Sequence, residues 1–233
     1  MLEVKVFTLY PDLFPGPLDI GIFKKAKENK IWNLKVINIR EYSKDNHGTV
    51  DDTPFGGGSG MLLRPDILAS ALDKNIKKGE KIIYLSPRGK KFDQNVARSL
   101  SKEKNINLIC GHFEGVDQRL LETRNIEEYS LGDFVLSGGE PACFVLIDAL
   151  VRLLPGVLGN KDSVKEESFE NHLLEYPQYT KPREWEGKSP PEVLFSGDHA
   201  KIKGWRLSQS EAITRRQRPD LWKKYLEKKN EKH

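Results

Sequence analysis

Cysteine is scarce in this chain of 233 residues, which contains only Cys110 and Cys143. Two cysteines are too few for a disulfide-stapled fold, and neither has a cysteine or histidine nearby at the spacing of zinc ligands. We therefore expect two small, buried, reduced side chains and no metal site. Reduced cysteines are typical of the cytoplasm, which is the location that we expect.

Long apolar runs are also missing. No segment has the roughly 20 apolar residues that a membrane-spanning helix needs. The first residues, Met1-Leu2-Glu3-Val4-Lys5-Val6-Phe7, lack the pattern of a secretory signal and instead predict a strand. With 37% hydrophobic residues, the chain has enough apolar side chains for a sizeable core.

Two familiar nucleotide-binding signatures are absent. The motif G-x-G-x-x-G does not follow the first predicted strand, where Thr8-Leu9-Tyr10-Pro11 stands instead, and no G-x-x-x-x-G-K-[ST] occurs. These absences argue against an ordinary dinucleotide-binding enzyme and against a P-loop ATPase.

Charge is unevenly distributed along the chain. The net charge is +4, but residues 171–233 hold 14 Lys and Arg against 9 Asp and Glu, whereas residues 1–170 hold 24 against 25. A near-neutral body with a basic terminal region is typical of proteins with a polyanionic partner. A solvated basic helix explains the same pattern, and charge alone does not separate the two.

Short apolar runs alternate with helical patterns over the first two thirds of the chain. Strands are predicted at residues 4–9, 34–39, 81–86, 107–110 and 134–136, and helices at residues 20–27, 65–75, 93–102, 117–123 and 142–154. This alternation predicts an α/β fold with a parallel sheet, whose ligand site lies at the carboxyl ends of the strands. The long polar stretch at residues 41–64 contains a glycine-rich loop, residues 56–60, with no strand expected before it.

The pattern changes after Pro155-Gly156. Residues 157–170 are polar without a clear period, as in a linker, and Ser208-Gln209-Ser210-Glu211 has the form of a capping box that opens a basic helix. A second helix is predicted at residues 221–229, after an interruption at Pro219. We therefore divide the chain into an α/β domain (1–160), a linker (161–170) and a small helical domain (171–233).

Three glycine-bearing loops follow predicted strands: Ser86-Pro87-Arg88-Gly89, Gly111-His112-Phe113-Glu114-Gly115 and Ser137-Gly138-Gly139-Glu140. In a parallel sheet such loops gather at one edge, where main-chain groups could hold a small ligand. Glycine-rich turns before helices also arise for steric reasons alone, so the loops by themselves leave both interpretations open.

Several charged and aromatic residues have both a structural and a functional interpretation. Glu114 lies between two glycines, Arg152 falls near the end of an apolar helix where the helix dipole favours a cation, and Glu167 lies in the predicted linker. The basic region also interleaves Trp205 and Trp222 with Arg and Lys, which suits phosphate contacts and base stacking as well as a small hydrophobic core.

Several motifs, taken in order and spacing, resemble one family over essentially the whole chain. They are Val50-Asp51-Asp52 with Pro54-Phe55-Gly56-Gly57-Gly58, Tyr84-Leu85-Ser86-Pro87, Cys110-Gly111-His112-Phe113-Glu114-Gly115-Val116-Asp117, Leu131-Gly132-Asp133-Phe134-Val135-Leu136-Ser137-Gly138-Gly139-Glu140, Pro155-Gly156-Val157-Leu158-Gly159, and Leu173-Leu174-Glu175-Tyr176-Pro177-Gln178-Tyr179-Thr180-Lys181-Pro182. The family is that of the bacterial tRNA (guanine-N1)-methyltransferases, TrmD, of the SPOUT class.

The resemblance implies an α/β domain with a deep trefoil knot that binds S-adenosylmethionine as methyl donor. It also implies a helical tRNA-binding domain, a homodimer with active sites shared between subunits, and methylation of the guanosine 3′ to the anticodon (guanosine-37). The residues that it places at the donor site are Tyr84, Leu85, Ser86, Pro87, Gly111, Glu114, Leu131, Gly132, Phe134, Leu136, Gly138 and Gly139.

The resemblance also assigns roles in catalysis and RNA binding. Glu167 stands where the family has its catalytic aspartate, Arg152 would stabilise charge on the guanine, and Glu114 would face the reacting centre. Contacts with RNA are expected from four residues: Asp51, Arg206, Arg215 and Arg216.

The sequence departs from the family pattern in places. Glu167 is one methylene longer than the usual aspartate, and His112-Phe113 replaces an Arg-Tyr pair that is common in relatives. Two alternatives therefore accompany the assignment: methylation of another RNA base or ribose, and a non-catalytic RNA-binding protein.

Overall fold

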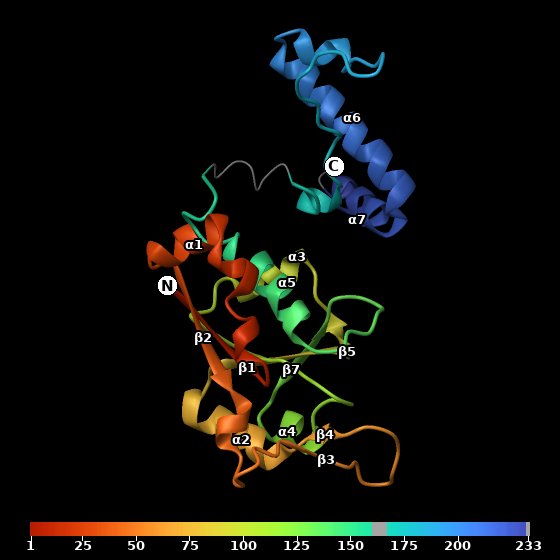
Figure 1. Ribbon diagram of the computed structural model, residues 1–233. Helices are drawn as coiled ribbons and strands as arrows, with labels where there is room; N and C mark the ends of the chain where they lie inside the picture. Colours follow the sequence, from red (N-terminus) through yellow and green to blue (C-terminus); the bar gives the residue numbers. More distant parts are fainter. Residues whose placement is uncertain (160–166, 232–233) are drawn as a thin grey trace. The chain divides into compact units, whose positions relative to one another are not determined.

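The computed structural model describes residues 1–159 and 167–231, and the chain divides after Gly159 into two compact units (Figure 1). Each unit is described by itself. Most of the predicted linker, residues 161–166, lies outside the described residues. Within the described ranges, no helix is both long and apolar enough to cross a membrane.

The first unit is built on a five-stranded sheet in the order β2-β1-β6-β5-β7. Every neighbouring pair in this sheet is parallel, which confirms the predicted α/β fold with a parallel sheet. The strands are β1 (Leu2–Thr8), β2 (Trp32–Asn38), β5 (Lys81–Lys91), β6 (Asn105–Ile109) and β7 (Glu127–Ser130).

Helices cover both faces of this sheet (Figure 1). The side chains of α1 (Gly21–Glu28), α3 (Gln94–Leu100) and α5 (Glu140–Val151) join one buried apolar cluster, and those of α2 (Pro65–Asn75) and α4 (Gln118–Thr123) join another. Strand β1 shows why the sheet separates them: Val4 and Val6 point into the first cluster and Phe7 into the second, with the period of two that a pleated strand requires.

The fifth strand is not where the sequence predicts it. The sequence predicts a strand at residues 134–136, but these residues lie in a loop with their side chains largely exposed, and the edge strand is instead β7. β7 is short and polar, and it pairs only with β5. An edge strand tolerates polar side chains because it is only half covered, so its sequence lacks the apolar run that marks an inner strand.

β3 (Asp51–Asp52) and β4 (Leu62–Leu63) pair as a short antiparallel hairpin. The glycine-rich loop at residues 56–60 connects these two strands, so the expectation that no strand precedes this loop is wrong. β4 lies against the loop after β6, because the N–H of Leu63 donates to the carbonyl of Gly115 at 3.0 Å.

The second unit contains two long helices, α6 (His199–Gln217) and α7 (Pro219–Asn230). The predicted capping box at Ser208 is wrong, since it lies inside α6. The helix begins nine residues earlier, where the Asp198 carboxylate accepts from the N–H groups of Ala200 and Lys201, both at 3.1 Å.

Short 3-10 helices occur in both units. They are η1 (Pro11–Leu13), η2 (Gly16–Asp19), η3 (Ile39–Tyr42), η5 (Glu170–His172) and η6 (Glu192–Phe195).

Candidate functional site

A cavity of about 520 Å³ opens in the first unit beside the middle of β5 and the carboxyl ends of β6 and β7. The twelve residues predicted for a donor site all line it. Further lining residues are Leu62, Arg88, His112, Phe113, Gly115, Val116, Gln118, Tyr129, Ser130, Val135, Ser137 and Ala142. The three glycine-bearing loops, which are dispersed in the sequence, therefore meet around one space.

The first wall is a bulge in β5. The register between β5 and β7 shifts between Leu85 and Lys90, so residues 86–89 loop out of the ladder toward the cavity. The Ser86 hydroxyl accepts from the N–H of Arg88 at 3.2 Å and closes this loop. A Cβ on Gly89 would lie 2.4 Å from the backbone nitrogen of Tyr129, so only glycine allows the bulge to return to β7 at this point.

The second wall is the loop after β6. The N–H of Gly115 donates to the carbonyl of His112 at 3.0 Å, and the N–H of Glu114 donates to the carbonyl of Met61 at 2.9 Å. The exposed Glu114 carboxylate is thus carried on a turn fixed from both sides, and Glu114 lines the cavity. Burial raises the pKa of the Tyr84 phenol at the base of this wall, which stays neutral at physiological pH.

The third wall is the loop from Leu131 to Gly139, which leads into α5. Phe134, Val135 and Leu136 are exposed in this chain, with Val135 the most exposed at 85%, whereas Leu131 packs against the core. At the end of the loop the N–H of Gly139 donates to the carbonyl of Gly111 at 2.9 Å, which joins the third wall to the second. The cavity thus combines apolar side chains with main-chain polar groups, a pattern typical of sites for small organic ligands.

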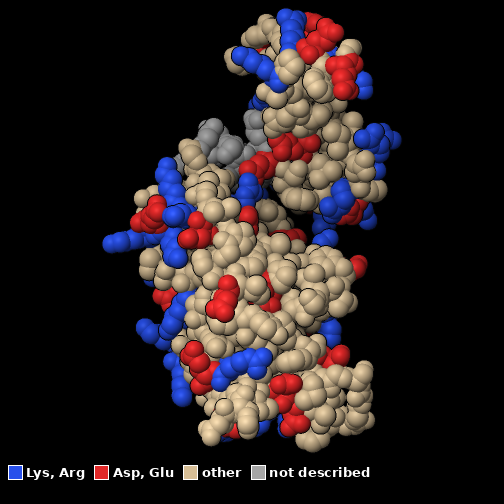
Figure 2. All heavy atoms as spheres, viewed as in Figure 1, with Lys and Arg blue, Asp and Glu red and all other residues tan. Residues whose placement is uncertain are grey.

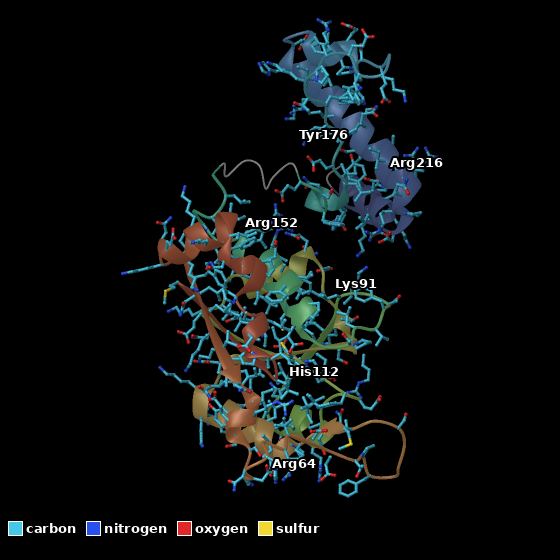
Figure 3. The ribbon with its side chains drawn as sticks, viewed as in Figure 1. Arg64, Lys91, His112, Arg152, Tyr176 and Arg216 are labelled. Carbon is cyan, nitrogen blue, oxygen red and sulfur yellow. The ribbon has the colours of Figure 1, made fainter. Side chains whose placement is uncertain are left out.

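Arg152 and Glu167 are not brought to this cavity within the first unit. Arg152 caps the carboxyl end of α5, whereas residues at the amino end of that helix line the cavity, and twelve helical residues span about 18 Å. Figure 3 shows Arg152 and His112 well apart accordingly. Glu167 is partly buried and belongs to the second unit.

The residues expected to bind RNA are divided between the two units. Asp51 is in β3, and the other three are on α6. Arg215 and Arg216 are exposed in the last turn of α6, whereas the Arg206 guanidinium lies over the ring of Tyr176, with Cζ 4.8 Å from its centroid. On the face drawn in Figure 2, basic and acidic side chains of the second unit are intermingled.

Both tryptophans of the basic region are partly buried and pack against tyrosines. The Trp205 and Tyr179 ring centroids are 6.3 Å apart, and those of Trp222 and Tyr225 are 5.3 Å apart. These contacts agree with the structural interpretation of the two tryptophans.

Sequence reasoning missed several residues of the site. Arg88, His112 and Tyr129 line the cavity without having been assigned to it, and the buried Glu140 lies behind it. His112 and Glu140 stand within the quoted motifs, but no local pattern shows that their side chains meet. Among the residues that the structure describes, no group of three or more His, Cys, Asp or Glu side chains is placed to hold a metal ion.

Comparison with known proteins gives a consistent result. The family model described as tRNA (Guanine-1)-methyltransferase TrmD matches residues 2–224. A tRNA (guanine-N(1)-)-methyltransferase of Pelagibacter ubique is 70% identical over 230 residues, which cover 99% of this chain and all of the relative. Proteins of the same name from Rhodospirillum rubrum and Wolbachia pipientis are 50% and 51% identical, and each match covers 94% of the relative.

Proposed function

This chain belongs to the tRNA (guanine-1)-methyltransferase TrmD family, and we propose that it transfers a methyl group from S-adenosylmethionine to N1 of the tRNA guanosine 3′ to the anticodon (guanosine-37). The activity as a tRNA (guanine-N1)-methyltransferase follows from the identity shared with named relatives. The donor, the position in tRNA and the residue roles are our proposal. The observation that carries the choice of donor is that all twelve residues expected at the donor site line one cavity.

The cavity fits the proposed donor in size and in chemistry. Its volume lies in the range of about 300–1,000 Å³ that is usual for small-molecule sites. Gly111, Gly138 and Gly139 offer backbone without side chains, and a Cβ at any of them would meet an atom within 3 Å. Leu131, Phe134 and Leu136 supply apolar surface for a purine ring.

Proton transfer is the step for which the protein must provide a base. When bound, S-adenosylmethionine supplies an electrophilic methyl group on its sulfonium sulfur. Guanine N1 carries a proton at neutral pH, so its electron pair becomes available only when a base accepts that proton. We assign this role to the Glu167 carboxylate.

Charge stabilisation is the second requirement. As the proton leaves N1, negative charge spreads to O6 of the guanine, where the Arg152 guanidinium would stabilise it. The Glu114 carboxylate would face the reacting centre from the second wall of the cavity. Because Arg152 lies at the far end of α5 from the cavity of its own chain, the proposal includes a homodimer in which a second copy completes each site.

We further propose the deep trefoil knot of the SPOUT class for the first unit and a tRNA-binding role for the second. The close passage of the α5 start against Cys110 and Gly111 is compatible with a chain that threads through a loop. The excess of basic residues beyond residue 170 suits contacts with tRNA phosphates.

A methylation assay tests the proposal as a whole. Purified protein, labelled S-adenosylmethionine and an unmodified tRNA transcript with guanosine at the target position should yield 1-methylguanosine there, located by mass mapping. A methyl group on another base or on ribose would refute the proposed target. Donor binding without any transfer would favour the non-catalytic RNA-binding alternative.

Glu167→Gln tests the base. General-base catalysis contributes roughly 10²–10⁴-fold, so we expect kcat to fall by at least about 100-fold while the Kd for the donor stays within about twofold. Glu184→Gln, which alters an exposed carboxyl of the same unit, is the matched control and should leave kcat unchanged. Equal turnover in Glu167→Gln and the parent would exclude Glu167 as the base.

A further inference from the structure

Glu140 is a buried carboxylate that the proposed chemistry does not use. It is the first residue of α5 and only 2% exposed. The Thr8 hydroxyl donates to its Oε1 at 2.5 Å, and Nε2 of His112 lies 2.9 Å from Oε1 and 2.8 Å from Oε2. Three segments meet here: the end of β1, the loop after β6 and the start of α5.

The surrounding groups form hydrogen bonds with both oxygens of the Glu140 carboxylate. Burying an ionised carboxylate is costly unless it is hydrogen-bonded, and here both oxygens accept while the amino end of α5 adds a favourable field. An ionised Glu140 only accepts hydrogen bonds, so this contact then requires a proton on Nε2 of His112. The Thr8 oxygen in turn accepts from the N–H of Tyr10 at 2.9 Å.

This network supports two walls of the cavity. A Cβ on Gly138 would lie 2.4 Å from Cε1 of His112 and 2.8 Å from Oε2 of Glu140, so the imidazole and the carboxylate fill the space next to Gly138. The Tyr10 ring meets the imidazole edge-on, with centroids 4.9 Å apart, and restricts its movement. His112 and Gly138 both line the cavity, so any movement of the ring would displace its surface.

We propose that Thr8, His112 and Glu140 form a positioning network that fixes the separation of the second and third walls of the donor cavity. His112 then determines how tightly the donor binds, through its hydrogen bond to Glu140, and it takes no part in proton transfer from the guanine. This inference rests on the proposed function, because it assumes that the cavity binds S-adenosylmethionine.

The test compares two replacements of His112 in the full-length protein. Leu in place of His removes the N–H donor, whereas the amide nitrogen of Gln reaches about as far as Nε2 and keeps it. For His112→Leu we expect the Kd for S-adenosylmethionine to rise by about tenfold, the equivalent of one hydrogen bond to a charged group. His112→Gln should recover to within about threefold of the parent. At saturating donor, kcat should stay within about twofold in both variants.

Glu80→Gln separates positioning from general destabilisation. Glu80 is a carboxylate of the same unit with only 9% of its side chain exposed, and it accepts from Nζ of Lys5 at 3.0 Å and Nδ2 of Asn107 at 3.3 Å. Its partner Lys5 also donates to the carbonyl of Asn75 in α2, and Glu80 does not line the cavity. This variant should lower the urea midpoint of unfolding without changing the Kd for the donor.

The outcomes are distinguishable. Unchanged donor affinity in His112→Leu would overturn the proposal, as would a loss of kcat larger than the loss of affinity. If His112→Leu does not fold, Thr8→Val is measured in its place. This variant replaces one hydroxyl with a methyl group. Its Kd should rise by about threefold or more, and an unchanged value overturns the proposal. A parent protein that binds no S-adenosylmethionine would instead refute the proposed function itself.

Discussion

Gly139 stands where the start of α5 passes close to the residues that follow β6. A Cβ at this position would lie 2.7 Å from Cα of Cys110 and 2.7 Å from the nitrogen of Gly111. Both are backbone atoms, which cannot yield as the end of a flexible side chain can. The close packing of these two segments therefore depends on the missing side chain, and it places the Gly139 N–H 2.9 Å from the carbonyl of Gly111, to which it donates.

Gly139→Ala should destabilise the fold and weaken donor binding together. We expect the free energy of unfolding to fall by roughly 2 kcal/mol or more, because α5 must move away from Gly111. Urea unfolding and titration with S-adenosylmethionine measure the two effects. Gly159→Ala is the matched control, since a Cβ there meets no atom within 4 Å. If both variants behaved alike, the close approach would have no energetic consequence.

Cysteine shows how far single residues could be interpreted from sequence. The expectation of two buried thiols is confirmed: Cys110 and Cys143 are both inaccessible to solvent, and burial raises the pKa of the Cys110 thiol. Their Sγ atoms lie 3.3 Å apart, which sequence could not reveal. The same limit applies to Thr8 and Glu140, since contacts between residues 132 positions apart exist only once the sheet has formed.

At the scale of elements, the inner strands and the helices of the first unit were largely predictable, since burial on both faces leaves apolar runs in the sequence. β7 and the start of α6 were not. β7 is specified by its pairing with β5, including the bulge, and not by its own composition. For α6, the Ser208 motif competes with the Asp198 cap, and the structure uses Asp198.

β7 also provides a test that depends on pH. The Glu127 carboxylate accepts from Nζ of Lys81 at 2.6 Å and from the Tyr129 hydroxyl at 2.8 Å. The hydrogen bond from Lys81 lowers the pKa of Glu127, whereas burial, together with the bond to Glu127, raises the pKa of Tyr129 to about 12. A carboxyl with a lowered pKa stabilises the folded state above its unfolded pKa of about 4.3, and this contribution is lost as the pH falls through its folded pKa.

Glu127→Gln should therefore lower the free energy of unfolding at pH 7 by only about 0.5–1 kcal/mol, because both side chains are a third or more exposed to solvent. The difference from the parent should shrink toward zero below about pH 4. Urea unfolding at pH 7, 5 and 3.5 checks this, and Lys81→Met should follow the same trend. A difference independent of pH would mean that the ion pair is not its source.

Two substitutions in and beside helix α6 should change the free energy of unfolding in opposite directions. Asp198→Ala removes the side chain that caps the first turn and should lower the free energy of unfolding of the second unit. Gly204→Ala, inside the same helix where a Cβ meets no atom within 4 Å, should raise it by about 0.5–1 kcal/mol. Far-ultraviolet circular dichroism during urea unfolding measures both. A loss in Gly204→Ala would show that this position is constrained by something other than the helix.

At the scale of the whole molecule, the cavity belongs to the first unit, and the excess of basic residues lies in residues 171–233, which include the two long helices. The charge asymmetry was visible in the sequence, because it requires only counting. The assignment of residues 1–160, 161–170 and 171–233 to donor binding, linker and tRNA binding stays a prediction, since it concerns roles and not contacts. Arg152 lies at the carboxyl end of α5, whereas the amino end of this helix lines the cavity, and the proposed homodimer is the part of the proposal that addresses this separation.

The salt dependence of the affinity for tRNA tests whether the second unit binds the RNA, as proposed. If the basic unit binds tRNA through phosphates, the affinity should fall linearly on a log–log scale with salt, because each contact releases a condensed counterion. Arg215→Ala and Arg216→Ala each remove one exposed cation from the last turn of α6 and should reduce the slope by about 1. The Kd for S-adenosylmethionine should not change in either variant.

Lys78→Ala is the control for these two variants. It removes one exposed cation from the first unit, outside the cavity, and it changes the net charge by the same amount. Fluorescence titration of tRNA at 50–300 mM salt should give a parental slope for Lys78→Ala and reduced slopes for the two arginine variants. If the slope were reduced equally in all three variants, net charge alone would attract the RNA. In that case the last turn of α6 would not be its phosphate-binding surface.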